Sequence, residues 1–458
     1  MTENWTTLRE LLLPAVGARG RAVESALRGA IRDGQLAAGL RLPSSRDLAA
    51  QLGVSRGTVT SAYGQLVAEG YLTSRHGSGT RVAEGIGRAT PPAEPARPAR
   101  QWRFDLRPGL PALGAFPRAE WAAATRSALA DLPDEALGYP DPSGWPELRA
   151  ELAGYLGRVR AVTATAGDVV ITHGAAEGLS LLASVVGGRI AVEEPGHPGQ
   201  VEMLRANGST PVPTTVDEHG IDVDALRRNG CRAVVVTAAH QFPLGVALRP
   251  ARRHALLAWA RDHDGLIIED DYDAEHRYDR PALRAVQAME PSRVAYLGSV
   301  SKTLAPALRL GWLVLPPALR ATTVRRKEVT DLGCSPLPQA AFATLLRSGG
   351  YDRHLRRTRA LYRTRRDALL GAIADRLPDW EPVGVAAGLH VVLRLPAGTD
   401  DAATSALLAG RGVNAPALST YATHPPYPGL VLGYAATTPD RLRAAVAEIA
   451  RITRPGGR

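Results

Sequence analysis

The stretch LGSVSKTLAPALRLGW, residues 297–312, holds one of only two lysines in an arginine-rich chain. Lysine and arginine together number 55, and lysine occurs only as Lys302 and Lys327. A guanidinium group stays protonated, whereas the ε-amine of lysine can condense with an aldehyde to form a Schiff base. Lys302 follows an apolar run and small residues, a pattern typical of a site at a strand end, although a lysine surviving by chance is the alternative. Lys327, in VRRKEV, is interpreted as a plain surface residue.

Composition is that of an ordinary globular protein, with 45% hydrophobic and 22% charged residues. A length of 458 residues suffices for two or three domains. No apolar run reaches the roughly 18 residues of a transmembrane helix, and the N-terminus lacks a basic signal region. We therefore expect a cytoplasmic protein with no membrane partner. Cys231 and Cys334 are too few for a disulfide framework, which fits a reducing compartment.

The formal net charge is +10, which indicates either an anionic partner or simply arginine-rich composition. Residues 19–82 contain nine arginines against four acidic residues, which is half of the whole excess. After them, residues 83–104 are rich in Pro, Ala and Arg without apolar periodicity, as in a linker. The sequence thus predicts a small domain over residues 1–82 and a large one over residues 105–458.

Three helical patterns and a hairpin follow one another in the small domain. Apolar residues recur at helical spacing over residues 22–31, and Ser44 and Ser55 are predicted N-caps of two further helices. YLTSRHGSGTRVA then alternates as two short strands around a turn. This order predicts a winged helix-turn-helix whose third helix enters the major groove, unless it is a plain three-helix unit with solvated arginines. Arg56 can then pair with guanine, and phosphate contacts are predicted for Arg41, Arg46 and His76.

The segment LRLPSSRDLAAQLGVSRGTVTSAYGQLVAEGYLTSRHGSGTRVA resembles the GntR family of DNA-binding domains over nearly its full length. Thr60 stands where some relatives have a further arginine, so the base preference need not follow theirs. The partner implied is an operator in double-stranded DNA. The resemblance implies DNA contacts by Arg46, Ser55, Arg56, Thr58, His76 and Gly77.

From about residue 105, short β-rich apolar runs alternate with helical stretches. The runs are DVVITHG, RIAVEEPG, AVVVTAAH, GLIIEDDY and RVAYLGSVSK. Continuous apolar runs separated by helices predict an α/β fold with a parallel sheet covered on both faces. Ligands of such sheets bind at the carboxyl ends of the strands, where the polar motifs of this chain fall.

Those motifs meet the needs of pyridoxal phosphate, which requires a carboxylate at its ring nitrogen, a phosphate cradle and a ring-stacking group. GLIIEDDYDAEH supplies carboxylates and a tyrosine, and the turn in THGAAEGL supplies helical N–H groups. Each motif has another interpretation: a solvated acidic loop or a metal site with His276 for the first, any strand–helix turn for the second. Side chains suited to the phosphate are Arg309, Ser299 and Ser301.

Residues 105–458 resemble fold-type I aminotransferases, and their fusion to a GntR domain resembles the MocR family of transcription regulators. The resemblance implies a mainly parallel sheet, a small subdomain over about residues 318–458, and a homodimer. It implies a Schiff base between pyridoxal phosphate and Lys302. The other implied contacts are Arg309 to the phosphate, Asp270 to the ring nitrogen, Tyr272 to the phenolic oxygen and His197 stacked on the ring.

Three departures from an aminotransferase affect the expected activity. Phe242 stands where working enzymes place an asparagine, and Ala175 and Ala176 replace hydroxyl residues of the phosphate turn, leaving the backbone N–H groups there. Val431, in GLVLGYA, stands where an arginine clamps the substrate carboxylate. These changes favour a sensor over an enzyme, and no metal is expected.

Three hypotheses follow for the large domain. In the first, pyridoxal phosphate is itself the signal that modulates operator binding. The valine at position 431 resembles the residue in the subset of the family that regulates vitamin B6 synthesis, where the cofactor is the signal. In the second, an amino acid or amine is sensed through the bound cofactor. In the third, the domain is an active aminotransferase.

Overall fold

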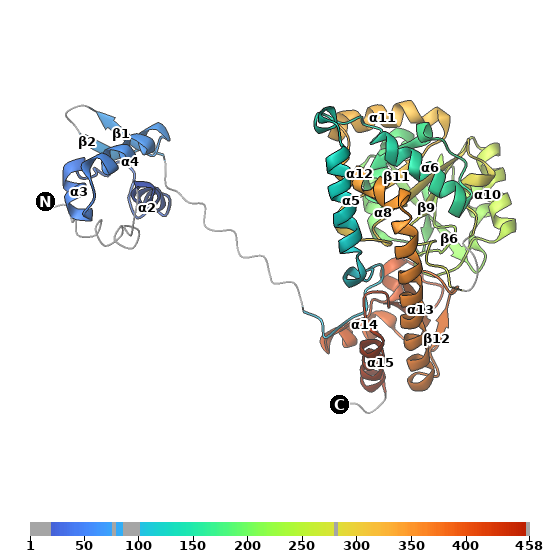
Figure 1. Cartoon of the computed structure of the whole chain (residues 1–458). Helices are drawn as coiled ribbons and strands as arrows, with labels where there is room; N and C mark the ends of the chain where they lie inside the picture. Colours follow the sequence, from blue (N-terminus) through green and yellow to red (C-terminus); the bar gives the residue numbers. More distant parts are fainter. Residues whose placement is uncertain (1–19, 76–78, 86–100, 279–282, 455–458) are drawn as a thin grey trace. The chain divides into compact units, whose positions relative to one another are not determined.

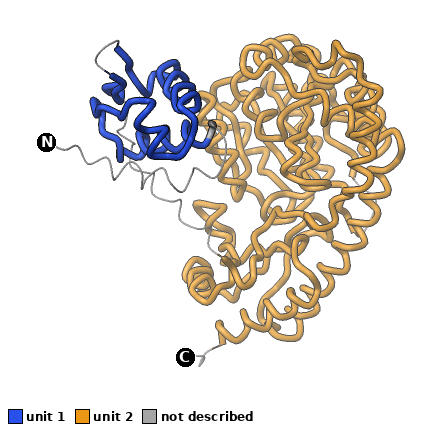
Figure 2. Tube along the Cα trace, turned by 60° about the vertical axis from the view of Figure 1, so that its left-hand side comes forward, with its two compact units in different colours: residues 1–100 blue, residues 101–458 orange. Residues whose placement is uncertain are grey.

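The computed structural model describes residues 20–75, 79–85, 101–278 and 283–454. The chain divides into two compact units, residues 1–100 and 101–458 (Figure 2). Each unit has its own cluster of buried apolar side chains. No helix within the described ranges is long and apolar enough to cross a bilayer.

The N-terminal unit is a winged helix-turn-helix, as predicted (Figure 1). The Ser44 hydroxyl accepts from the Asp47 N–H at 3.2 Å, and the Ser55 hydroxyl accepts from the Thr58 N–H at 3.1 Å, so both predicted N-caps are formed. Gly53 ends the middle helix at φ 67°, a conformation that favours glycine. The elements are α2 (Gly20–Arg32), α3 (Ser45–Leu52), α4 (Arg56–Ala68) and the antiparallel pair β1 (Leu72–Arg75) and β2 (Gly79–Val82).

An eight-stranded sheet forms the centre of the C-terminal unit, in the order β4-β11-β10-β9-β8-β5-β6-β7. β10, β9, β8, β5 and β6 are parallel neighbours in this order; the apolar runs predict the first four as strands, whereas β6 is not among those runs. β11 pairs antiparallel with both β10 and β4, and the sequence analysis did not identify it as a strand. The strands are β4 (Val169–Thr172), β5 (Arg189–Glu194), β6 (Thr210–Asp217), β7 (Gly220–Ile221), β8 (Ala233–Val236), β9 (Leu266–Asp271), β10 (Val294–Ser299) and β11 (Gly311–Val314).

Helices cover the sheet (Figure 1). Two apolar clusters contain side chains that alternate along its strands. In β9, for example, Ile267 belongs to one cluster and Ile268 to the other. Burial on both faces explains why these strands are continuously apolar. The helices are α5 (Arg118–Asp131), α6 (Pro146–Arg160), α7 (Ala175–Val186), α8 (Pro198–Ala206), α9 (Val223–Arg228), α10 (Pro250–Asp262), α11 (Pro317–Asp331) and α12 (Pro336–Arg347).

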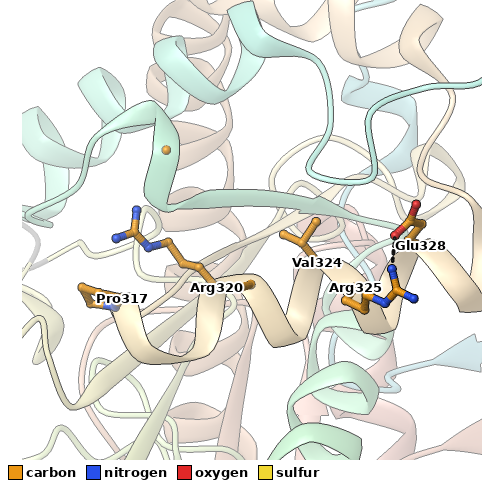
Figure 3. A pocket seen from close by; sticks show the side chains of 7 residues that line it. Pro317, Arg320, Val324, Arg325 and Glu328 are labelled. Carbon is orange, nitrogen blue, oxygen red and sulfur yellow. Dashed lines mark ion pairs between the residues drawn. The ribbon is translucent and has the colours of Figure 1, made fainter.

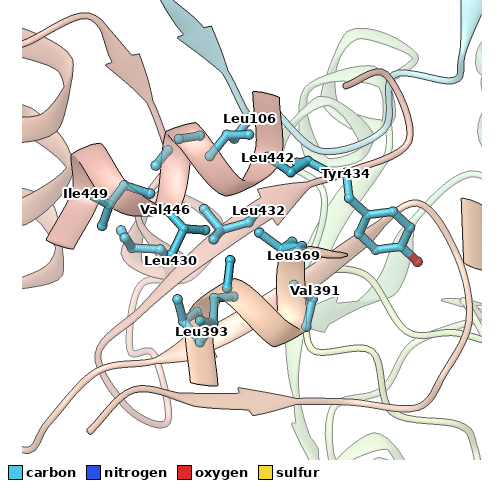
Figure 4. Close-up of a cluster of buried hydrophobic side chains, with 14 of the residues drawn as sticks. Leu106, Leu369, Val391, Leu393, Leu430, Leu432, Tyr434, Leu442, Val446 and Ile449 are labelled. Atoms are coloured by element: carbon cyan, nitrogen blue, oxygen red, sulfur yellow. The ribbon is translucent and has the colours of Figure 1, made fainter. Parts of the chain in front are cut away.

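A second core lies in the C-terminal part of the unit, where α13 (Gly350–Arg376) and α15 (Pro439–Thr453) pack together (Figure 4). Leu430 and Leu432 of β15 (Gly429–Gly433) lie in this core beside Val446 of α15 (Figure 4). The short strand β3 (Phe104–Asp105) pairs with β14 (Val413–Asn414), so the start of the unit lies against its C-terminal part. The remaining elements are β12 (Glu381–Val383), β13 (His390–Arg394), α14 (Asp401–Gly410) and β15 (Gly429–Gly433).

Candidate functional site

A cavity of about 590 Å³ lies where the carboxyl ends of β9 and β10 meet the starts of α7 and α8. All nine residues that the sequence analysis assigned to the cofactor line this one cavity, although they come from segments more than 100 residues apart. They are Ala175, Ala176, His197, Asp270, Tyr272, Ser299, Ser301, Lys302 and Arg309.

Lys302 lies three residues after the end of β10, and its ammonium nitrogen donates to the Gly109 carbonyl at 2.7 Å. Burial lowers the pKa of Lys302, while the nearby Asp273 and Asp270 carboxylates oppose that shift. A lowered pKa increases the fraction of neutral amine, the form that attacks an aldehyde carbon. The position and the protonation of Lys302 therefore suit a covalent attachment point.

Asp270, at the end of β9, presents a carboxylate to the cavity. One oxygen accepts from the Gln200 side chain at 2.8 Å, while the other, Oδ1, is buried and has no partner. Burial raises the pKa of Asp270 to about 7. An unpaired buried oxygen is costly, and a protonated ring nitrogen would satisfy it. The residues present thus fit a pyridine-type cofactor.

Glu269 and Asp271 of EDDYDAEH are buried and paired, which contradicts the alternative of a solvated acidic loop. Glu269 accepts from two backbone N–H groups, at residues 286 and 287. Asp271 accepts from Arg160 and from the Tyr296 hydroxyl, at 2.7 and 2.6 Å. Alternation along β9 explains why Asp270 alone of these three reaches the cavity.

The alternative of a metal site at His276 finds no support in the geometry. The His276 ring is fully buried and stacks on Tyr362, with centroids 4.9 Å apart. Within the described ranges, His276 is in neither of the two His, Cys, Asp and Glu groups that are close enough to hold a metal. Burial lowers its pKa to about 3, so the ring is neutral at physiological pH.

Tyr272 is fixed by a hydrogen-bonded pair behind the cavity wall. Its hydroxyl donates to the His240 carbonyl at 3.0 Å and lies 3.2 Å from the His240 Nδ1. That nitrogen in turn lies 2.9 Å from the Asp273 carboxylate. The Tyr272 hydroxyl has one proton, so it can donate to an oxygen on a bound ring only in place of its hydrogen bond to the His240 carbonyl.

An aromatic wall faces these polar groups. Phe242 is at its centre, with ring centroids 5.6 Å from His197, 5.1 Å from His390 and 5.2 Å from Tyr421. His197 is also the N-cap of α8, and its Nδ1 accepts from the Gly199 N–H at 3.1 Å. The cap orients the imidazole, so His197 can lie against one face of a planar ligand.

A phosphate-sized anion has donors at the start of α7. Gly174 precedes Ala175 with φ 81°, and a side chain there would meet the Arg309 guanidinium at about 3.1–3.2 Å. Arg309 donates to the His173 carbonyl at 2.6 Å, which holds the guanidinium beside the helix N-terminus. Because Ala175 and Ala176 offer no hydroxyl, backbone N–H groups and Arg309 are the donors at this turn.

Val431 does not reach the cavity. Its side chain is buried in the apolar cluster that also contains Val392 and Leu418. In β15 it pairs with Val392 of β13 across an antiparallel register. The position predicted for a carboxylate clamp is therefore part of the hydrophobic core in this protein.

Lys327 is not the surface residue that the sequence analysis predicted. Its side chain is 0% exposed, and its ammonium donates to Glu177 at 2.7 Å and to Asp331 at 2.6 Å. Although burial opposes it, the hydrogen bonds to Asp331 and Glu177 raise the pKa of Lys327. Glu177 also accepts from the backbone N–H of His173, next to the phosphate turn. Lys327 therefore fastens α11 to the start of α7.

The same two carboxylates belong to a possible metal-binding group with His173 and Cys334, whose ligand atoms all lie within 4.8 Å. The Lys327 ammonium already pairs with both carboxylates. Burial raises the pKa of Cys334 to about 12, which keeps it a thiol, a poor metal ligand. This group is accounted for as a structural ion-pair network.

A second cavity, of about 540 Å³, lies along α11 and contains no predicted site residue (Figure 3). Arg325 pairs with Glu328 across 3.8 Å (Figure 3). Arg320 pairs with Asp168 at 3.0 Å. The charged side chains that line this cavity are therefore held in ion pairs near the surface. None of the residues lining it has a buried polar side-chain atom without a partner. This cavity has no feature of a ligand site.

In the N-terminal unit, the predicted DNA-contacting side chains lie at the start of α4 and on its neighbours. Arg46, Ser55 and Arg56 are exposed, and Thr58 is half-buried beside the Ser55 hydroxyl. Arg41 is exposed next to Gly79 of the hairpin. The predicted contacts His76 and Gly77 lie outside the described residues.

Several cavity residues were missed by the sequence analysis. Glu193 is buried and accepts from the Thr237 N–H at 3.1 Å, and burial raises its pKa to about 7. Arg107 and Asn414 come from β3 and β14 regions more than 300 residues apart in the chain. Glu193 could have been predicted as a cavity residue because it is a carboxylate at the end of an apolar run, in RIAVEEPG. Arg107 and Asn414 could not, because they reach the cavity through the pairing of segments that are distant in the sequence.

Two family models match the chain. Bacterial regulatory proteins of the gntR family match residues 19–82, and aminotransferase class I and II matches residues 112–449. The probable rhizopine catabolism regulatory protein MocR of Rhizobium meliloti is 35% identical, over 93% of this chain and 92% of that protein. The chain belongs to the MocR family of transcription regulators. This MocR-family protein is also 35% identical to the pyridoxine biosynthesis transcriptional regulator PdxR of Corynebacterium glutamicum, over 92% of this chain and 93% of PdxR.

Solved aminotransferase structures share the fold of the C-terminal unit. A multiple substrate aminotransferase from Thermococcus profundus has a TM-score of 0.71 and 26% identity, covering 78% of this MocR-family chain and 92% of the enzyme. An archaeal alanine:glyoxylate aminotransferase has a TM-score of 0.70 and 25% identity, covering 77% and 91%. The α/β architecture with a mainly parallel sheet is therefore confirmed.

Proposed function

We propose that this protein is a DNA-binding transcription regulator that binds pyridoxal phosphate covalently at Lys302, and that binding changes its affinity for an operator. The observation that carries the proposal is the unpaired buried Oδ1 of Asp270, in the same cavity as the Lys302 amine, whose pKa is lowered by burial. A pyridine cofactor with an aldehyde would engage both groups.

The chain's own residues would divide the work as follows. The Lys302 amine would form a C=N bond with the aldehyde carbon, releasing one water molecule. Asp270 would hold a proton at the ring nitrogen, and Tyr272 would donate to the phenolic oxygen in place of its hydrogen bond to the His240 carbonyl. Arg309 and the N–H groups at Ala175 and Ala176 would bind the phosphate. Bound pyridoxal phosphate would supply an electron-withdrawing ring conjugated to this carbon.

Regulation requires that the cofactor bind one conformation of the protein better than another, since only differential affinity shifts an equilibrium. By linkage, the same coupling then changes DNA affinity. We propose a cytoplasmic homodimer, because a twofold-symmetric protein suits an operator with two half-sites. The relatives named as regulators of rhizopine catabolism and pyridoxine biosynthesis support a regulatory role.

We further propose that the unit is an aminotransferase domain used as a sensor, without turnover. The burial of Val431 in the core removes the carboxylate clamp from its expected place, and Phe242 replaces a polar partner of the cofactor. Sensing of an amino acid or amine is the second candidate, favoured by the presence of Arg107 on the cavity wall. An active aminotransferase is the third.

The test is chemical trapping of the attachment site. Purified protein is mixed with pyridoxal phosphate, its visible absorption is recorded, and borohydride then reduces the C=N bond to a stable C–N bond. Because the chain has two lysines, peptide mapping distinguishes them directly. We expect the label on Lys302 and none in Lys302→Arg, which keeps the charge but has no amine. A label confined to Lys327, or no label, refutes the proposal.

A further inference from the structure

The C-terminal unit has two arginines on the wall of the candidate cofactor cavity, Arg107 and Arg309. Arg309 is committed to the phosphate end, where it donates to the His173 carbonyl and contacts Gly174. Arg107 lies two residues from Gly109, whose carbonyl accepts from Lys302. Arg107 is thus the cavity arginine with no assigned ligand.

Asp105 locks the orientation of Arg107. The Nε donates to both Asp105 oxygens at 3.0 Å, and Nη2 donates to Oδ2 at 2.7 Å. The Asp105 carboxylate also accepts from the Asn414 side chain at 2.8 Å and from the Arg107 backbone N–H at 3.2 Å. Asp105 is therefore saturated, and it holds one edge of the guanidinium.

The remaining edge of this guanidinium, formed by Nη1 and the second Nη2 hydrogen, makes no hydrogen bond to any described residue. Guanidinium has five N–H donors, so an edge bound to one carboxylate leaves a second edge able to bind another bidentately. The side chain of Arg107 is 55% exposed, so its pair with Asp105 orients the group without removing it from the cavity mouth.

We propose that Arg107 binds the carboxylate of an amino acid whose amine reacts with the cofactor held on Lys302. This inference rests on the proposed function. In that reaction the ligand nitrogen replaces Nζ at the aldehyde carbon: a new C=N bond forms, the bond to Nζ breaks, and two protons pass from the ligand nitrogen to Lys302, which is released as an amine. The carboxylate site is supplied by the β3–β14 pairing instead of by position 431.

Matched ligands isolate the carboxylate. Alanine and ethylamine differ only in that group, as do leucine and 3-methylbutylamine. Each is titrated into cofactor-loaded protein, and the apparent Kd is read from the change in visible absorption. The variants are Arg107→Gln and, as a control, Arg103→Gln, which removes the same charge at a neighbouring exposed residue that does not line the cavity. Thermal stability is recorded for both.

We expect wild type and Arg103→Gln to prefer at least one amino acid over its amine, and Arg107→Gln to lose about 10- to 100-fold of that preference. Amine binding and the cofactor spectrum should be unchanged. An equal preference in Arg107→Gln and wild type refutes the role of Arg107, as does a wild type whose spectrum responds to neither member of any pair. Failure of wild type to bind the cofactor at all refutes the proposed function itself.

Discussion

Replacing each of the two lysines by methionine, which keeps most of the apolar stem, should affect different properties: Lys327→Met should lower the stability of the unit, and Lys302→Met should abolish cofactor attachment. Lys327→Met leaves Glu177 and Asp331 without their shared cation. Breaking a buried ion pair costs about 3–5 kcal/mol. Glu177 and Asp331 are 16% and 20% exposed, so water relieves part of this cost, and we expect about 2–3 kcal/mol.

Lys302→Met should have little effect on stability. The Lys302 ammonium makes one hydrogen bond, to the Gly109 carbonyl, and burial already disfavours its charged form. Losing that bond costs about 1 kcal/mol, which relief from desolvation offsets. The cofactor attachment, by contrast, should be abolished.

Thermal unfolding of the cofactor-free protein measures both effects. A loss of about 2–3 kcal/mol corresponds to roughly 5 °C in the Tm of a unit of this size, taking about 2 °C per kcal/mol. We expect this shift for Lys327→Met and less than about 2 °C for Lys302→Met. A wild-type Tm in Lys327→Met would show that the lysine is not part of the core, and an equal fall in both variants would contradict the separation of their roles.

Three further outcomes are expected. Buried Asp270 and Glu193 have pKa values of about 7, whereas a carboxyl group in the unfolded chain has a pKa of roughly 4. Between these values the cofactor-free folded state binds more protons than the unfolded state. Its stability therefore falls as the pH rises from about 4 to 7. The Tm of Asp270→Asn should therefore decline less over this pH range than the Tm of the wild type. Parallel plots of Tm against pH for the two proteins would contradict this prediction. Arg56→Ala should weaken operator binding by about 1–3 kcal/mol and relax base specificity, as measured by fluorescence anisotropy. Arg46→Ala should mainly reduce, by about 1, the slope of the logarithm of the operator-binding constant against the logarithm of the salt concentration. Because Phe242 stands in the cavity in place of a polar partner of the cofactor, amino donor and keto acid should show no turnover above free pyridoxal phosphate in a coupled assay, even with a carboxylate bound at Arg107; sustained turnover would revive the enzyme hypothesis.

The cofactor cavity was predictable because its chemistry depends on residues at strand ends. Lys302 and Asp270 each follow an apolar run, and adjacent parallel strands bring such ends together. The spacing within EDDYDAEH did not show which carboxylate faces the cavity; the family resemblance indicated Asp270, and the pleat of β9 gives the physical reason.

Other features depend on pairings between distant segments. Lys327 meets Glu177 from 150 residues away, so no local pattern distinguishes it from a solvated lysine. Arg107 reaches the cavity because β3 pairs with β14. β11 is a short run that follows Arg309 and reverses direction in the sheet, which apolar periodicity does not reveal.

The most direct test of the central claim is the affinity of the full chain for its operator with and without pyridoxal phosphate. The operator is first selected from random or genomic duplexes by the wild-type protein, and binding is then measured at fixed salt for wild type and Lys302→Ala. We expect the cofactor to change the operator Kd of the wild type by about 5- to 150-fold and to leave that of Lys302→Ala unchanged. The same operator Kd for wild type in both conditions would contradict the account.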